Sequence, residues 1–128
     1  MRSELMKRIR RKDTVPELLV RRYLHAHGLR FRLHDRALPG SPDIYLPKRS
    51  SVVFVHGCFW HGHDCRHGAV AAKTNAAYWS AKVADNRRRD LVKSNALRAL
   101  GLYVEVVWEC ECRRPHQLSE LATRLLTR

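Results

Sequence analysis

The spacing of apolar residues in the first third of the chain predicts a helix followed by a strand. Thr14 to Glu17 match a capping box with a proline in the first turn, so a helix is expected from there to about His27. Apolar and basic residues then alternate from Leu29 to His34. This period of two is typical of a half-buried strand with a basic outer face.

Two more strands are predicted before the middle of the chain. Residues 37–42 are rich in turn formers and lead to Asp43, which stands at the head of a short apolar run, residues 44–46. The β-branched run 52–55 predicts a central strand that ends at His56.

The second half predicts helices on either side of one strand. Helices are expected at 76–84 and 86–100, the second closed by Gly101, and a strand is expected at 103–108. Pro115 opens a final helix with one apolar stripe. With no internal repeat or linker, the fold class is predicted to be mixed α/β in a single domain, residues 1–128.

Charge narrows the choice of partner. The 128 residues contain 25 Lys and Arg against 12 Asp and Glu, a formal net charge of +13, which favours a polyanion and above all nucleic acid. Residues 1–13 read as a basic N-terminal arm that orders against phosphates or remains a solvated tail. Without a long apolar run or a signal-like N-terminus, we expect a cytoplasmic protein that binds no membrane.

Residues 56–65 concentrate histidine and cysteine. Cys58, His63 and Cys65 are ligand types that Zn²⁺ prefers, and Cys110, at the end of the predicted strand, is favoured over Cys112 as the fourth. Such a closed set predicts a structural zinc site. The alternative is ordinary reduced cysteines beside a surface histidine.

A second type of metal chemistry is predicted at the strand ends. A carboxylate such as Asp43 is a typical Mg²⁺ ligand beside a phosphate, and His56 and His61 are placed to transfer protons. A turn residue and two structural histidines are the alternative. Glu17 is explained by the capping box, and Asp90 either pairs with surface arginines or orients a catalytic histidine.

Together these motifs resemble the very short patch repair (Vsr) endonucleases over nearly the whole chain. The matching residues are Arg2-Ser3 with Met6 and Ile9, Thr14-x-Pro16-Glu17, Leu38-Pro39-Gly40-x-Pro42-Asp43, His56-Gly57-Cys58-Phe59-Trp60-His61-x-His63-x-Cys65, Trp79, and Val107-Trp108-Glu109-Cys110. The resemblance implies a restriction-endonuclease-like mixed sheet flanked by helices. It also implies nicking of one strand of duplex DNA beside a T:G mispair that arises from deamination of 5-methylcytosine.

The resemblance also implies roles for individual residues. Asp43 is expected to bind Mg²⁺, with two ions at the scissile phosphate. Val55 replaces the family's threonine and can serve through its backbone carbonyl. His61 is expected to be the general base, and His56 to contact water on the metal. Asp90 aligns with the carboxylate that supports the base, and Glu17 with a glutamate near the site.

DNA contacts follow from the same resemblance. Phe59 and Trp60 are expected to wedge into the major groove, assisted by Trp79, and Met6 to insert from the minor groove. The cationic residues expected to bind the DNA backbone are Arg2, Lys7, Arg8 and Arg87.

The leading hypothesis is therefore a Mg²⁺-dependent mismatch-nicking enzyme with a structural zinc. It is expected to act as a monomer at the bacterial nucleoid, with mismatch-repair proteins as candidate partners. Two alternatives are a non-catalytic mismatch-binding module and a related nuclease of a restriction or defence system with a different target.

Overall fold

The computed structural model of this chain describes residues 14–58 and 76–128. Within them the chain forms a four-stranded sheet, three α-helices and a short 3-10 helix, which confirms the predicted mixed α/β class. In chain order the elements are α2 (Val15–Ala26), β1 (Arg32–Leu33), β2 (Ile44–Leu46), η1 (Pro47–Arg49), β3 (Ser51–His56), α4 (Ala76–Ala99), β4 (Tyr103–Trp108) and α5 (Pro115–Leu126).

The sheet places Asp43 beside the end of β3. Its strand order is β1-β2-β3-β4, antiparallel from β1 to β3 and parallel between β3 and β4. β3 is an inner strand, as its β-branched run predicts. The short η1 turn joins β2 to β3, and in the resulting antiparallel register Ile44 pairs with Val53. The residue before β2 therefore lies next to the last residues of β3.

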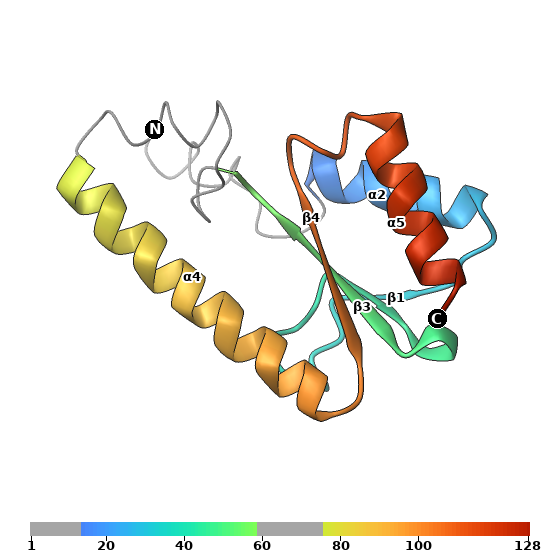
Figure 1. The fold of residues 1–128 in the computed structure, drawn as a ribbon, viewed down its shortest axis with the longest axis horizontal. Coiled ribbons are helices and arrows are strands. Elements are labelled where there is room, and N and C mark those ends of the chain that lie inside the picture. The colour runs from blue at the N-terminus through green and yellow to red at the C-terminus, as the bar shows by residue number, and fades with distance from the viewer. Residues whose placement is uncertain (1–13, 59–75) are drawn as a thin grey trace, which may run out of the picture.

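Helices cover both faces of the sheet (Figure 1). α2 and α5 lie on one face, where Leu24 and Leu125 pack in a core that includes Val53 of β3. α4 lies on the other face, where Leu97 packs with Val52 and Phe54. Alternate residues of β3 thus enter opposite cores, as the period of a strand requires.

The predicted strand at 29–34 is much shorter in the structure. β1 contains only Arg32 and Leu33, which pair with Tyr45 and Ile44. Leu29 is buried as expected, but the Leu33 side chain is 42% exposed. His34 then adopts a left-handed conformation, with φ of 47°, and this turn ends the strand.

The prediction of two helices at 76–84 and 86–100 is wrong. The structure has one continuous helix, α4, because no glycine or proline interrupts residues 77–99. Asp85, at the expected break, forms ion pairs with Arg88 and Arg89 one turn further on, at 3.8 and 3.0 Å. The predicted stop is correct: Gly101 has φ of 82° and donates its N–H to the Arg98 carbonyl.

The last two elements agree with the sequence pattern. β4 spans the predicted residues, and α5 buries Leu118, Leu121, Ala122 and Leu125 along one face. Among the helices that the structure describes, none is long and apolar enough to cross a membrane.

Candidate active site

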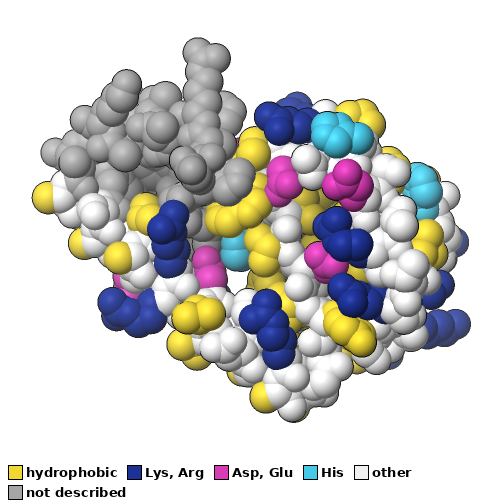
Figure 2. Space-filling model, in the orientation of Figure 1, with side chains coloured by type: hydrophobic (Ala, Val, Ile, Leu, Met, Phe, Trp, Pro, Cys, Tyr) yellow, Lys and Arg dark blue, Asp and Glu magenta, His cyan; other side chains and the backbone are white. Residues whose placement is uncertain are grey.

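A cavity of about 940 Å³ lies at the edge of the sheet where β2 begins and β3 ends. Its lining includes the acidic residues Glu17, Asp43 and Asp90, the histidines His34 and His56, and the cations Arg36 and Lys93. On the face shown in Figure 2, acidic and histidine side chains lie among lysines and arginines. The cavity thus combines possible metal ligands with groups that attract phosphate.

Glu17 has two functions in the structure. Its backbone N–H donates to Thr14 Oγ1 at 3.4 Å, so the predicted N-cap is present. Its carboxylate, only 3% exposed, accepts a 3.0 Å hydrogen bond from Arg21 one turn along α2. The cap therefore explains the backbone of Glu17 but not its buried side chain, whose charge is compensated by Arg21.

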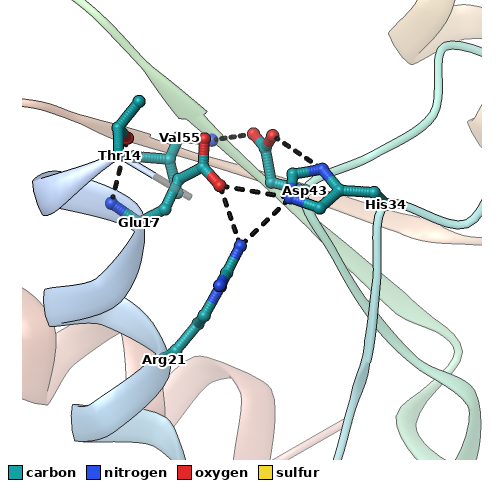
Figure 3. A network of polar contacts seen from close by, with 6 residues as sticks. All are labelled: Thr14, Glu17, Arg21, His34, Asp43 and Val55. Atoms are coloured by element: carbon teal, nitrogen blue, oxygen red, sulfur yellow. Dashed lines mark hydrogen bonds and ion pairs between the residues drawn. The ribbon is translucent and has the colours of Figure 1, made fainter. Parts of the chain in front are cut away.

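His34 joins Glu17 to Asp43 (Figure 3). Its Nε2 lies 3.3 Å from Glu17 Oε2 and 3.0 Å from Arg21 Nη2, and its Nδ1 lies 3.8 Å from Asp43 Oδ1. The left-handed backbone of His34, supported by its N–H bond to the Asp43 carbonyl, directs the ring into this position. The imidazole thus touches both acidic groups.

Asp43 is held by the neighbouring strand. Its Oδ2 accepts the Val55 N–H at 2.7 Å, which fixes the carboxylate across the β2–β3 pair. Burial raises the pKa of Asp43 from 3.8 to about 6, the nearby Glu17 carboxylate raises it as well, and the Val55 hydrogen bond opposes both. A bound cation would offset this cost of ionisation.

The three residues could hold a divalent metal ion. One ligand atom from each of Glu17, His34 and Asp43 lies within 4.8 Å of the other two. Two carboxylates and an imidazole form a donor set suited to a divalent cation that also keeps water or phosphate ligands.

His56 and Asp90 form a second pair at the same cavity. His56 Nε2 lies 3.9 Å from Asp90 Oδ1 of α4, and the His56 ring stands edge-on to Trp108, 5.2 Å between centroids. Asp90 is predicted to support the general base His61, which lies outside the described residues; the described histidine that it faces is His56. A carboxylate in this position can orient an imidazole and stabilise its charged form.

The cysteines that the structure describes, Cys58, Cys110 and Cys112, lie in two environments. Cys58 is buried, and its Sγ accepts the Cys110 N–H at 3.4 Å, so these two predicted zinc ligands are neighbours. Cys112 instead donates from Sγ to the Trp108 carbonyl at 3.4 Å and packs in the core between the sheet and α5. Burial, with help from Glu111 and Glu109, raises the pKa of the Cys112 thiol to about 12.

Two of the predicted DNA-binding residues belong to α4. Trp79 lies in its first turn, and Arg87 is exposed further along that helix. The predicted residues in the undescribed ranges are Arg2, Met6, Lys7, Arg8, Phe59, Trp60, His61, His63 and Cys65.

Sequence reasoning missed His34, Arg21 and Lys93. His34 was expected on the outer face of a strand, whereas it faces the cavity. Histidine is among the residues enriched in left-handed conformations, and His34 stands where the alternation ends, which is the signal that could have identified a turn there.

Known relatives of this chain cut DNA. Residues 1–67 match the family described as DNA mismatch endonuclease Vsr. The chain is 54% identical to the type II nicking enzyme V.XorIIP of Xanthomonas oryzae pv. oryzae, over 86% of this chain and 80% of that protein. It is 39% identical to the DNA mismatch endonuclease Vsr of Escherichia coli, over 94% of this chain and 77% of that protein.

The chain belongs to the Vsr DNA mismatch endonuclease family. The resemblance seen in its motifs is thereby confirmed. This Vsr-family protein is a DNA endonuclease, hence a hydrolase, and its partner is DNA. A third relative, the type II nicking enzyme V.NmeAIP of Neisseria meningitidis serogroup A, is 42% identical over 98% of this chain and 89% of its own length.

Asp43→Asn is expected to stabilise the metal-free protein at neutral pH. Because the folded-state pKa is raised, the folded protein binds this proton more tightly than the unfolded chain between pH 3.8 and about 6. Wild-type stability should therefore fall relative to Asp43→Asn as the pH rises through that window. The difference above it should be on the order of 1–3 kcal/mol.

Denaturant unfolding with EDTA, at several pH values on both sides of this window, measures the effect. The two proteins should converge in stability at the acid end. A difference that stays constant across the whole pH range would contradict the burial of an ionised Asp43.

Proposed function

We propose that this endonuclease nicks one strand of duplex DNA beside a T:G mispair and that it requires Mg²⁺. The observation that supports the proposal is the cluster of buried Glu17 with half-buried His34 and Asp43 in the lining of the cavity. Its carboxylates suit Mg²⁺, and the surrounding cations suit a phosphodiester. The sheet with helices on both faces is also compatible with the expected restriction-endonuclease-like core.

The chain's own residues would divide the work of hydrolysis. Mg²⁺, when bound, supplies charge stabilisation at the phosphoryl oxygens. Asp43 is proposed to hold it, together with the Val55 carbonyl that the family resemblance implies, and Glu17 and His34 lie close enough to Asp43 to supply further ligands. The same resemblance implies two such ions. Valine in place of threonine removes a hydroxyl but leaves the backbone carbonyl for this purpose.

Proton transfer is assigned to the histidines. His61 is proposed as the general base that takes a proton from the attacking water. His56, whose Nε2 lies 3.9 Å from Asp90 Oδ1, is proposed to act beside His61 at the scissile phosphate. The edge contact of His56 with Trp108 restricts the ring, which favours a fixed direction of proton transfer.

Recognition of the mispair is assigned to apolar side chains. Phe59 and Trp60, with Trp79, are proposed to enter the major groove, and Met6 the minor groove. Unstacking a base step costs a few kcal/mol, and least at a mispair, so such wedges select damaged sites. The basic residues Arg2, Lys7, Arg8 and Arg87 are proposed to bind backbone phosphates.

A different target is the second candidate. The names of two relatives describe type II nicking enzymes, which favours a nuclease of a restriction system with its own sequence context. Membership of an endonuclease family, in contrast, disfavours a module that only binds mismatches.

The remaining proposals follow from the substrate. An asymmetric lesion cut on one strand needs no two-fold symmetry, so we propose a monomer. Work on chromosomal DNA implies a cytoplasmic site at the bacterial nucleoid, where mismatch-repair proteins are candidate partners.

Asp43→Ala and His61→Ala should each abolish nicking of an end-labelled T:G duplex in Mg²⁺, by at least about 10³-fold, since metal binding and proton abstraction are lost. Binding to the same duplex should persist. Glu120→Ala, an exposed carboxylate on α5, is the control and should nick normally.

The panel should include matched, T:G and other mismatched duplexes. A single nick confined to the T:G duplex supports the proposed target. Equal cleavage of matched duplexes, or full activity of Asp43→Ala, would refute it.

Zinc content tests the predicted structural site of Cys58, His63, Cys65 and Cys110. Protein purified without added metal should carry about one equivalent of zinc, because a closed four-ligand site binds tightly. Cys110→Ser should lose it. Cys112→Ser is the matched control and should keep it, because Cys112 packs in the core with its Sγ turned to the Trp108 carbonyl.

Elemental analysis of folded protein provides the measurement. Less than about half an equivalent in wild type, or equal loss in the two serine variants, would count against this ligand set.

A further inference from the structure

The loop that delivers Asp43 rests on a lysine of α4. Gly40 has φ of 74°, and a Cβ built there would lie 2.6 Å from Lys93 Cγ and 2.8 Å from its Cβ and Cδ. These atoms form the near part of the side chain, which has little freedom to move aside. The Lys93 stem is therefore packed directly against the loop backbone, and only glycine permits this approach.

The same lysine lines the candidate active-site cavity. Lys93 is half-buried and lies one turn after Asp90 on α4, so both side chains belong to the helix face that borders the cavity. Among the residues that the structure describes, no carboxylate lies within 4.0 Å of its ammonium group. Its charge is thus available to an external anion.

A cation at this cavity would reduce the repulsion between its acidic lining and a DNA phosphate. Glu17, Asp43 and Asp90 give the cavity an acidic lining that repels the DNA backbone when no metal is bound. Arg36 supplies a cation from the loop, where it is exposed, and Lys93 supplies one from the helix, where its stem is fixed.

We propose that Lys93 is a positioning residue that binds a DNA backbone phosphate next to the scissile one. The ammonium group offers three donors and a compact charge, which suits a phosphate oxygen. Packing of the stem on Gly40 reduces the conformational entropy that the side chain loses on binding. One side chain would therefore contact both the loop that carries Asp43 and the bound phosphate, and would fix their relative position. This inference rests on the DNA endonuclease activity, but not on the choice of mispair.

Lys93→Met tests it, because methionine keeps an unbranched apolar stem and loses the charge. DNA binding is measured by titration in EDTA across a series of NaCl concentrations, with a matched and a T:G duplex. Loss of one phosphate contact should reduce the slope of log K against log salt by about 0.9 and weaken binding about five-fold on both duplexes.

Two further variants make the comparison specific. Lys93→Arg should restore the slope and the affinity to within about two-fold, since it restores the cation. Lys48→Met removes an exposed lysine at η1, at the opposite end of β2 and β3, and should leave the slope unchanged. In nicking assays, Lys93→Met should raise KM while kcat stays within about three-fold.

The outcomes separate this proposal from the proposed mismatch specificity. An unchanged slope in Lys93→Met, or an equal change in Lys48→Met, overturns the role of Lys93 even if T:G duplexes are nicked selectively. A reduced slope on both duplexes supports it even if the enzyme shows no preference for the mispair.

Discussion

The burial of Asp43 against the Val55 N–H is the interaction on which the rest of the site depends. A carboxylate removed from water becomes costly to ionise, and here burial raises the pKa of Asp43 to about 6. The β2–β3 register fixes the carboxylate in spite of this cost. A group that is rigid, poorly hydrated and next to a second buried carboxylate, that of Glu17, has much to gain from a divalent cation.

The elements around the sheet converge on this point. α2 contributes Glu17 with Arg21, the turn after β1 contributes His34, and α4 contributes Asp90 and Lys93. Separate cores on the two faces of the sheet hold these helices, so the groups on α2 and α4 are positioned by rigid elements. The cavity lining combines the acidic residues Glu17, Asp43 and Asp90 with the cations Arg36 and Lys93, a combination that suits a metal ion beside a phosphodiester.

The features that could be predicted from the sequence are those that depend on local residue patterns. Asp43, His56, β4 and the apolar face of α5 follow from residues close together in sequence. The contacts of Glu17 and His34 in the site do not follow from local sequence, because they depend on how α2 packs beside the turn after β1. The capping box also accounts for the backbone of Glu17 without requiring a role for its side chain. The break predicted in α4 falls just before the cationic run 87–89, where the sequence contains no glycine or proline to end a helix. The Cys58–Cys110 contact was expected from strand ends meeting at one edge.

Glu17, His34 and Asp43 are proposed to form a metal centre. Mn²⁺ is a spectroscopic substitute for Mg²⁺, and titrating it into zinc-loaded protein under electron paramagnetic resonance counts the sites directly. Mn²⁺ binding should strengthen as the pH rises through about 6, where Asp43 ionises, and it should be lost in Asp43→Asn but retained in Glu120→Gln. Binding of Mn²⁺ by Asp43→Asn with wild-type affinity and the same pH dependence would contradict the proposed metal centre.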